Sequence, residues 1–135
     1  MAKIYKNIVG GKELDAATKK TFENRNPANW DEIVGIFPQS TKDDVNQAIS
    51  VAKKAYSSWR KVPIPKRAEI MRKAGEILEK RKEDLAQIMT REMGKVLKET
   101  RGDVQEGIDT AFYAAGEGRR FFGRTVPSED RKSVV

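Results

Sequence analysis

The chain has 135 residues, of which 38% are hydrophobic and 35% charged, and it carries a formal net charge of +7. This length allows one domain with a hydrophobic core, and the absence of both cysteine and histidine excludes disulfides, thiolate nucleophiles, histidine bases and Cys/His metal sites from these residues. No apolar run approaches the roughly 18 residues that span a membrane, and the N-terminus lacks an apolar signal core. We therefore expect a cytoplasmic protein without a membrane partner.

The first forty residues alternate short extended runs with turn residues, which predicts strands. Gly10-Gly11 separates Ile8-Val9 from residues 12–14, and two glycines between extended runs are typical of a hairpin. A second extended run covers residues 21–26. We expect a turn at residues 29–31 and a further strand from Ile33 to Phe37, which Pro38 ends.

Four helices are predicted after Pro38. Thr41 and Asp44 resemble a capping box at the start of the first, and Pro65 suits the first turn of the second. Gly94 is a natural stop for the third, and the fourth starts near Val96. Each has an apolar stripe at helical spacing. The stripe of the second helix consists of Ile70, Met71, Ala74, Ile77 and Leu78.

The fourth predicted helix contains several glycines, Gly102, Gly107, Gly116 and Gly118. Each costs about 1 kcal/mol relative to alanine in a helix interior. Their number indicates close approach of another backbone or of a ligand. We favour close packing over ligand contact.

Positive charge is concentrated between Lys53 and Lys82, where 11 basic and 3 acidic residues give a local balance of +8. Such a segment can attract nucleic acid. The charges, however, fall between apolar positions, and no cluster of aromatic residues for base stacking accompanies them. We favour solvated helix faces, and a basic nucleic-acid-binding helical domain stays open as an alternative.

Nucleotide-binding motifs do not occur in the chain. No GxGxxG follows a predicted strand, and Gly94-Lys95 lacks the preceding glycine and following hydroxyl residue of a phosphate-binding loop. Composition and motifs alone therefore predict a soluble, mostly helical domain with an N-terminal β segment.

The order of several segments, however, is similar to that of the NAD(P)-dependent aldehyde dehydrogenase superfamily. The segments are IVGGKEL (8–14), NPAN (26–29), DEIVGIFP (31–38), AYSSW (55–59), KRAEIMRKAGEIL (66–78), REMGKVLKE (91–99), GDVQEGIDTAFYAAG (102–116) and VPSE (126–129). Their order and spacing cover essentially the whole chain. Within the superfamily the chain looks closest to the α-aminoadipic or succinic semialdehyde dehydrogenases.

The resemblance implies an α/β fold, in which an N-terminal hairpin and strand segment and four helices form the first layer of a Rossmann-like cofactor domain. Residues 1–123 would belong to the NAD(P)-binding domain, and residues 124–135 would form a loop and the start of the oligomerisation strand. Family enzymes are homo-oligomers that oxidise an aldehyde, here in particular a semialdehyde, to a carboxylic acid with NAD or NADP. A cysteine thiolate attacks the aldehyde, hydride leaves to the cofactor, and a glutamate-activated water hydrolyses the thioester.

The resemblance also implies that the cysteine and the glutamate lie beyond Val135. We therefore expect no catalytic residue among these 135 and no turnover or cofactor binding by the chain alone. An alternative is that a split gene encodes the chain as an assembly partner for the missing part.

Two minor sites are implied within the chain. Gly102 and Glu106 would face the substrate tunnel, where the carboxylate of Glu106 would bind a cationic substrate end. The alternative for Glu106 is a solvated helix charge. Arg25 and Glu92 correspond to the positions at which some family members hold a structural monovalent cation with main-chain oxygens and an acidic residue. There the alternative is a solvated Glu92.

Overall fold

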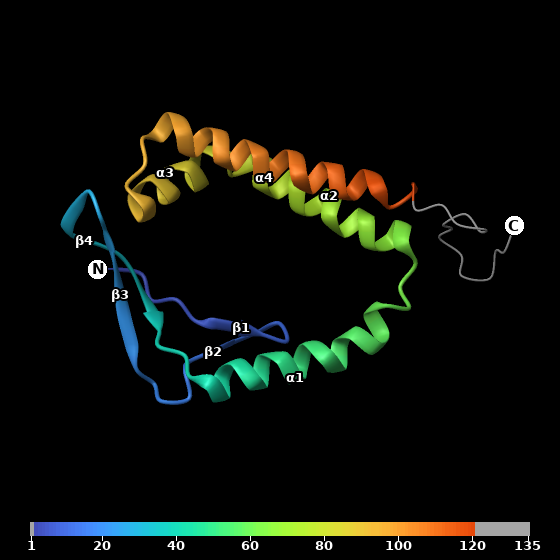
Figure 1. Ribbon diagram of the computed structural model, residues 1–135, viewed down its shortest axis with the longest axis horizontal. Helices are drawn as coiled ribbons and strands as arrows, with labels where there is room; N and C mark the ends of the chain where they lie inside the picture. Colours follow the sequence, from blue (N-terminus) through green and yellow to red (C-terminus); the bar gives the residue numbers. More distant parts are fainter. Residues whose placement is uncertain (1, 121–135) are drawn as a thin grey trace, which may run out of the picture. The chain divides into compact units, whose positions relative to one another are not determined.

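The structure of the chain, a computed structural model, describes residues 2–120 (Figure 1). The chain divides into two compact units. The first runs to Arg60 and includes Arg91–Gly94, and the second consists of Lys61–Thr90 and the residues from Lys95 onward. The predicted loop and strand start at residues 124–135 lie outside the described residues.

The N-terminal hairpin forms as predicted. Strands β1 (Asn7–Val9) and β2 (Lys12–Leu14) pair in antiparallel register. Gly10 and Gly11 join them with φ angles of 60° and 77°, the left-handed conformation that favours glycine in a tight hairpin turn. A Cβ at Gly10 would lie 3.1 Å from Val51 of the following helix, so this turn also needs a small residue for packing.

Strands β3 (Thr21–Asn26) and β4 (Asn29–Pro38) form a second antiparallel pair. The turn between them is Pro27-Ala28, so the predicted turn at residues 29–31 was wrong, and these residues begin β4. The side-chain oxygen of Asn26 accepts a hydrogen bond of 2.9 Å from the Ala28 amide. Together with the fixed φ of Pro27, this bond closes the chain reversal earlier than predicted.

Helix α1 (Lys42–Trp59) begins at the predicted capping box. The Thr41 amide donates to Asp44 over 2.7 Å, and the Thr41 hydroxyl donates to the same carboxylate over 2.9 Å. Asp44 also accepts from the Ala17 amide at 2.9 Å, which ties the β2–β3 connection to the helix. These bonds, first that from the Thr41 amide, lower the pKa of Asp44. None of the residues of α1 is buried.

Helices α2 (Ile64–Lys80), α3 (Lys82–Met93) and α4 (Leu97–Glu117) confirm the rest of the helical prediction. Pro65 lies in the first turn of α2, where its missing N–H costs nothing. Gly94 follows α3 with a φ of 73° and ends it. Within the part of the chain that the structure describes, no helix combines the length and the apolar character needed to cross a membrane.

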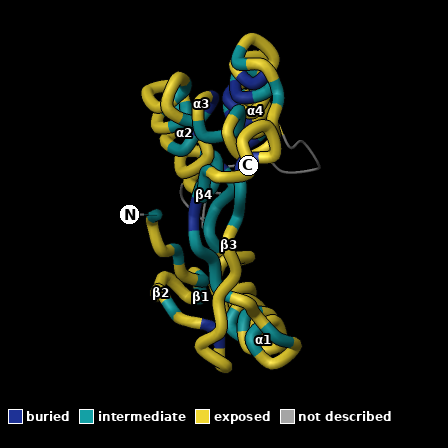
Figure 2. Tube along the Cα trace, turned by 90° about the vertical axis from the view of Figure 1, so that its left-hand side faces the viewer, coloured by how far each residue is buried: buried dark blue, intermediate teal, exposed yellow. Residues whose placement is uncertain are grey.

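A small apolar core lies in the second unit. Ala86 of α3 packs with Val104 and Ile108 of α4, and half-buried apolar residues of the same helices and of α2 surround them. The buried residues of α4 are its dark blue segments in Figure 2. Beside them the Thr100 hydroxyl is fully buried, lies 2.8 Å from the Thr90 hydroxyl and donates to the Leu97 carbonyl. Both hydroxyls therefore have partners, as buried polar groups require.

Helices α2 and α4 lie side by side and meet through small residues (Figure 1). A Cβ at Gly75 would lie 3.1 Å from the Phe112 ring, and one at Gly118 only 2.1 Å from the Ala68 Cβ. Only part of the predicted apolar stripe of α2 makes this contact, since Leu78 packs against the core at Val104 and Ile108, whereas Ile70 and Ile77 are 53% and 58% exposed. Ala68 and Gly75 allow α2 to approach α4 closely, so the side of α2 that faces α4 combines small residues with part of the stripe.

Candidate functional site

Helix α4 has a buried face and an exposed face. Thr100, Val104, Ile108 and Ala111 recur at intervals of three or four residues and are buried. Gly102 and Glu106, the predicted substrate-binding pair, are four residues apart and both exposed. Both therefore lie on the exposed side of α4. No finding tests their contact with a substrate.

The glycines of α4 do not all serve close packing. Added Cβ atoms at Gly102 and Gly107 would meet nothing within 4 Å, and both residues are exposed. At Gly116 the nearest atom would be the flexible end of Arg120. Only at Gly118 does an added Cβ collide with a neighbouring helix. The close-packing interpretation therefore holds for Gly118 and is wrong for Gly102 and Gly107 within the described residues.

Glu106 differs from its polar neighbours because it has no partner in the described part of the chain. Asp103 pairs with Lys95 over 2.6 Å, which raises the pKa of that lysine. Gln105 accepts a hydrogen bond from Lys82 at 2.6 Å and donates one to Asp109 at 2.8 Å. The carboxylate of Glu106 is therefore exposed and unpaired among the described residues.

The two residues predicted for a cation site lie in the first unit. Arg25 donates to the Trp30 carbonyl at 2.9 Å and forms an ion pair with Glu23 at 2.5 Å. Glu92 accepts a hydrogen bond of 3.2 Å from the side chain of Asn24, the residue before Arg25. The carboxylate and this part of β3 are thus close together. Among the described residues, no group of three or more acidic, histidine or cysteine side chains suits a metal ion.

An adjacent network holds the end of α3 against the β3–β4 turn. The Asn26 amide donates to Glu32 over 2.7 Å, and Arg91 forms an ion pair with the same carboxylate over 2.6 Å. The hydrogen bond from Asn26 and then that from Arg91 lower the pKa of Glu32. Next to it, a Cβ at Gly94 would lie 3.0 Å from the Pro27 ring. This network is structural, and it positions Glu92 beside β3.

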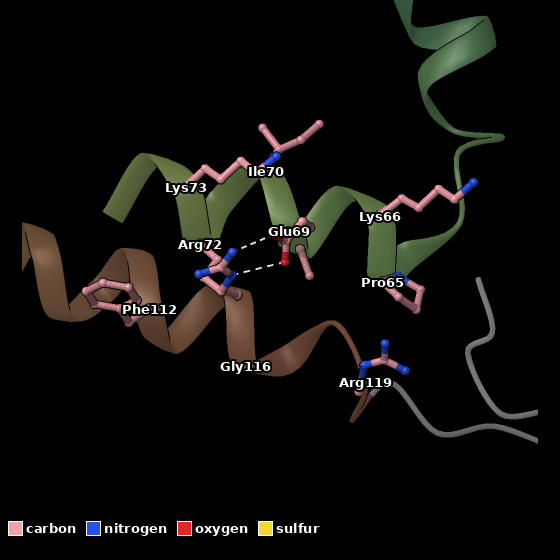
Figure 3. Close-up of a pocket in the computed structure, with 11 residues that line it drawn as sticks. Pro65, Lys66, Glu69, Ile70, Arg72, Lys73, Phe112, Gly116 and Arg119 are labelled. Atoms are coloured by element: carbon pink, nitrogen blue, oxygen red, sulfur yellow. Dashed lines mark hydrogen bonds and ion pairs between the residues drawn. The ribbon is translucent and has the colours of Figure 1, made fainter. Parts of the chain in front are cut away.

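An open groove of about 690 Å³ runs between α2 and α4 (Figure 3). Its floor includes Ala68, Phe112 and Gly116. Arg72 donates two hydrogen bonds of 2.6 and 3.0 Å to Glu69 and forms a further ion pair with Glu76. Within the groove Glu69 and Arg72 therefore satisfy each other, and the form of the groove alone identifies no ligand.

A comparison with known protein families shows to which family the chain belongs. Residues 14–135 match the aldehyde dehydrogenase family, which is most of the chain. The chain belongs to the aldehyde dehydrogenase family.

Two curated members of this family illustrate the similarity. Malonate-semialdehyde dehydrogenase 1 of Geobacillus kaustophilus is 39% identical over 123 residues, which are 91% of this chain and 25% of the relative. The alpha-ketoglutaric semialdehyde dehydrogenase of Bacillus subtilis is 36% identical over 131 residues, which are 97% of this chain and 27% of the relative. The chain therefore spans about a quarter of the length of the curated relatives that it matches.

Solved structures of aldehyde dehydrogenases confirm the predicted fold. An NAD-dependent aldehyde dehydrogenase from Sinorhizobium meliloti is 33% identical, with a TM-score of 0.86 over 91% of this chain and 25% of its own. Betaine aldehyde dehydrogenase from Staphylococcus aureus, solved with NAD+, is 26% identical, with a TM-score of 0.84 over 93% of this chain and 26% of its own. The strand pairs and four helices thus match about a quarter of each of these solved aldehyde dehydrogenase chains.

Some residues that matter in this part of the aldehyde dehydrogenase fold were not predicted. The Asn26–Glu32–Arg91 network joins residues up to 65 positions apart, and no local pattern links them. Arg67 was missed as well, although its Nε atom is a buried donor that has no hydrogen-bond partner in the described part of the chain. The one available signal was the NPAN segment, because asparagine before proline commonly accepts hydrogen bonds in turns.

Proposed function

We propose that the protein to which these residues belong oxidises an aldehyde to a carboxylic acid with NAD+ or NADP+. The aldehyde gives a hydride to the cofactor, water supplies the second oxygen, and acid, reduced cofactor and a proton result. The observation that carries the proposal is the match of residues 14–135 to the family, with two semialdehyde dehydrogenases 39% and 36% identical. NAD-bound aldehyde dehydrogenases among the structural relatives support the cofactor class.

In this proposal these residues supply neither the cofactor site nor the nucleophile. No glycine-rich turn joins a strand to a helix in the described range, where Gln39 and Ser40 link β4 to α1, and the sequence has no cysteine. Both groups would therefore come from other residues of the protein. In this proposal residues 1–123 belong to the NAD(P)-binding domain, residues 124–135 start the oligomerisation strand, and the protein is a cytoplasmic homo-oligomer.

The exposed face of α4 would border the substrate. Gly102 leaves open space there, and Glu106 presents a carboxylate that is unpaired within residues 2–120. The names of the two relatives contain malonate semialdehyde and α-ketoglutaric semialdehyde. Each of these compounds carries a carboxylate, which Glu106 would repel. The substrate that fits Glu106 is therefore an aldehyde whose far end is cationic, such as a semialdehyde with an amino group.

Arg25 and Glu92 would contribute to a monovalent cation site. The supporting observation is that Glu92 already reaches β3 next to Arg25. The chain's melting temperature should then rise in potassium chloride compared with choline chloride at the same concentration, and Glu92→Gln should remove the difference. Equal melting temperatures in the two salts would remove this site from the proposal.

The test of the main proposal is turnover of the complete protein. With a panel of semialdehydes and either cofactor, the absorbance of the reduced cofactor should rise in proportion to protein concentration. The isolated 135-residue chain should give no rise above buffer. Absence of turnover with every aldehyde and both cofactors would overturn the proposed activity, and turnover by the isolated chain would overturn its non-catalytic role.

A further inference from the structure

The groove between α2 and α4 carries an excess of positive charge. Four basic side chains and one acidic side chain line it. The acidic one, Glu69, is engaged by Arg72, which also pairs with Glu76. Lys66 and Lys73 are exposed, and in the described part of the chain they form neither an ion pair nor a side-chain hydrogen bond. The groove therefore presents two lysine ammonium groups that no acidic side chain holds.

These lysines belong to a regular row along α2. Lys66, Lys73 and Lys80 follow one another at intervals of seven residues. Seven residues are nearly two helical turns, so the three lie on the same side of the helix, about 10 Å apart along its axis. Lys80 is exposed as well. Cations repeated along a line favour a ligand with several negative charges along its length over one with a single anionic group.

The fold adds an aromatic ring that the basic segment of the sequence lacks. Phe112 of α4 lines the same groove as Lys66 and Lys73, although it lies far from both in the sequence (Figure 3). Part of the ring packs against α2, where a Cβ at Gly75 would lie 3.1 Å away. Phe112 is only half-buried, so the remainder of the ring is accessible from the groove.

Lysines in a row beside an aromatic ring suit one class of polyanion. In single-stranded nucleic acids the phosphates pair with lysines, and the unpaired bases stack on aromatic side chains. An acidic peptide would use the lysines but would have no planar group for the ring. In a duplex the bases are already stacked on one another. Ala115 and Gly116 also line the groove, and their small size leaves room for a base beside Phe112.

We propose that the groove between α2 and α4 binds single-stranded nucleic acid. Lys66 and Lys73 contact phosphates, Phe112 stacks against a base, and Lys80 extends the contact along the strand. Arg119 adds positive charge on the α4 side of the groove. This binding is separate from the oxidation of an aldehyde and does not rest on the proposed function.

The test measures binding of a fluorescein-labelled oligo(dT) of about 12 nucleotides, a length within the range of single-strand sites. The complete protein is titrated at low salt in saturating NAD+, so that any cofactor site is occupied. Fluorescence anisotropy should rise, and the affinity should fall steeply as salt is added. Absence of binding at low salt would overturn the proposal. Binding that NAD+ abolishes would place the oligonucleotide in a cofactor site and would overturn it too.

Removal of the two lysine charges tests the phosphate contacts. Lys66→Gln with Lys73→Gln should weaken binding about tenfold or more at low salt. The slope of log affinity against log salt should become shallower by about 1.4, because each phosphate contact on a single strand contributes about 0.7. Lys12→Gln with Lys20→Gln removes the same charge from exposed positions of the first unit and should bind as the wild type. An equal loss in both double variants would show that net charge, and not the groove, attracts the oligonucleotide.

Replacement of Phe112 tests the stacking. Phe112→Leu keeps an apolar side chain but removes the ring, so binding should weaken about 5- to 150-fold, equivalent to roughly 1–3 kcal/mol for one stacked base. Phe112→Tyr keeps a ring and should bind as the wild type. Thermal melts check that both variants are folded. If the leucine variant melts at too low a temperature to be assayed, the lysine variants still decide the proposal.

Two further ligands separate nucleic acid from other polyanions. A duplex of the same length and a poly-glutamate peptide should both bind more weakly than the single strand, and Phe112→Leu should not change their affinities. Equal binding of the peptide and the oligonucleotide would mean that the groove accepts any polyanion. Equal binding of the duplex would mean that no base meets the ring. Either result would overturn the proposed ligand.

Discussion

At the scale of single residues, Glu32 and Glu106 show two contrasting uses of a carboxylate. Glu32 is held by Asn26 and Arg91, and it joins the β3–β4 turn to the end of α3. Glu106 has no partner within the described residues and faces outward from α4. Substitution of Glu32 should therefore change the stability of the chain and its pH dependence. Substitution of Glu106 should change the recognition of another molecule.

We expect the stability of the chain to fall with decreasing pH in part because of Glu32. Its pKa is lowered in the folded state, so its contribution is complete above the unfolded-state pKa of about 4.3 and is lost as the pH falls through the folded-state value. Melting temperatures of Glu32→Gln measured across the acidic range should show a smaller decrease than the wild type. Glu79→Gln, at an exposed position, is the control. Parallel curves for wild type and Glu32→Gln would contradict this role.

For Glu106 we expect an effect on substrate choice. In the complete enzyme, Glu106→Gln should lower kcat/KM for an amino-bearing semialdehyde about 10- to 150-fold, the value of one charge-assisted hydrogen bond of roughly 1.5–3 kcal/mol. A neutral aldehyde should react almost unchanged, and one with a carboxylate should react faster because a repulsion is removed. The measurement is the ratio of kcat/KM between the three aldehydes. An unchanged ratio would make Glu106 a solvated helix charge, and an equal loss for all would point to helix packing.

At the scale of elements, local chemistry was enough to predict most boundaries. Gly10-Gly11, the Thr41–Asp44 box, Pro65 and Gly94 each act within a few residues of their position, and the structure confirms all of them. It was harder to predict which side of each helix packs against its neighbours. Which face of α2 meets α4 depends on Ala68 and Gly75, and their close contacts exist only once the two helices are packed. For the same reason the sequence could not distinguish Gly118, which packs against α2, from Gly102 and Gly107, which have open space around them.

The glycines of α4 should respond to alanine in opposite directions. Gly107→Ala adds a methyl group in open space and removes the cost of glycine in a helix, so it should stabilise the chain by about 1 kcal/mol. Gly118→Ala places a Cβ 2.1 Å from that of Ala68 and must separate the helices, at a cost of roughly 1–3 kcal/mol. Denaturant unfolding of both variants measures the difference. Stabilisation of both would mean that α2 and α4 do not approach as closely at Gly118 as the structure indicates.

At the scale of the whole molecule, the described residues bury little apolar surface for their number. Ile108 and Thr100 are the largest fully buried side chains in the described residues, whereas many large apolar residues stay exposed on both units. In α1 these are Val45, Ile49, Tyr56 and Trp59. The apolar spacing correctly predicted the buried side of α4, but spacing cannot tell whether the surface that covers a stripe belongs to the same 135 residues. The exposed stripes agree with a chain that spans a quarter of the length of its relatives.

The isolated chain should therefore bind an apolar dye or associate with itself, even under conditions in which its helices are intact. Ile70→Lys together with Ile77→Lys should lower dye fluorescence without a lower melting temperature, because these side chains are exposed on α2 and do not belong to the core. Ile108→Ala should instead raise dye fluorescence and lower the melting temperature. It removes a side chain that is only 1% exposed, so it should cost about 2–5 kcal/mol and raise dye binding as the core loosens. Fluorescence titration, sedimentation and thermal melts of the three proteins measure these effects. A wild-type chain that is a monodisperse monomer, melts sharply and binds no dye would show that the 135 residues cover their own apolar surface, and that the stripes on α1 and α2 need no further partner.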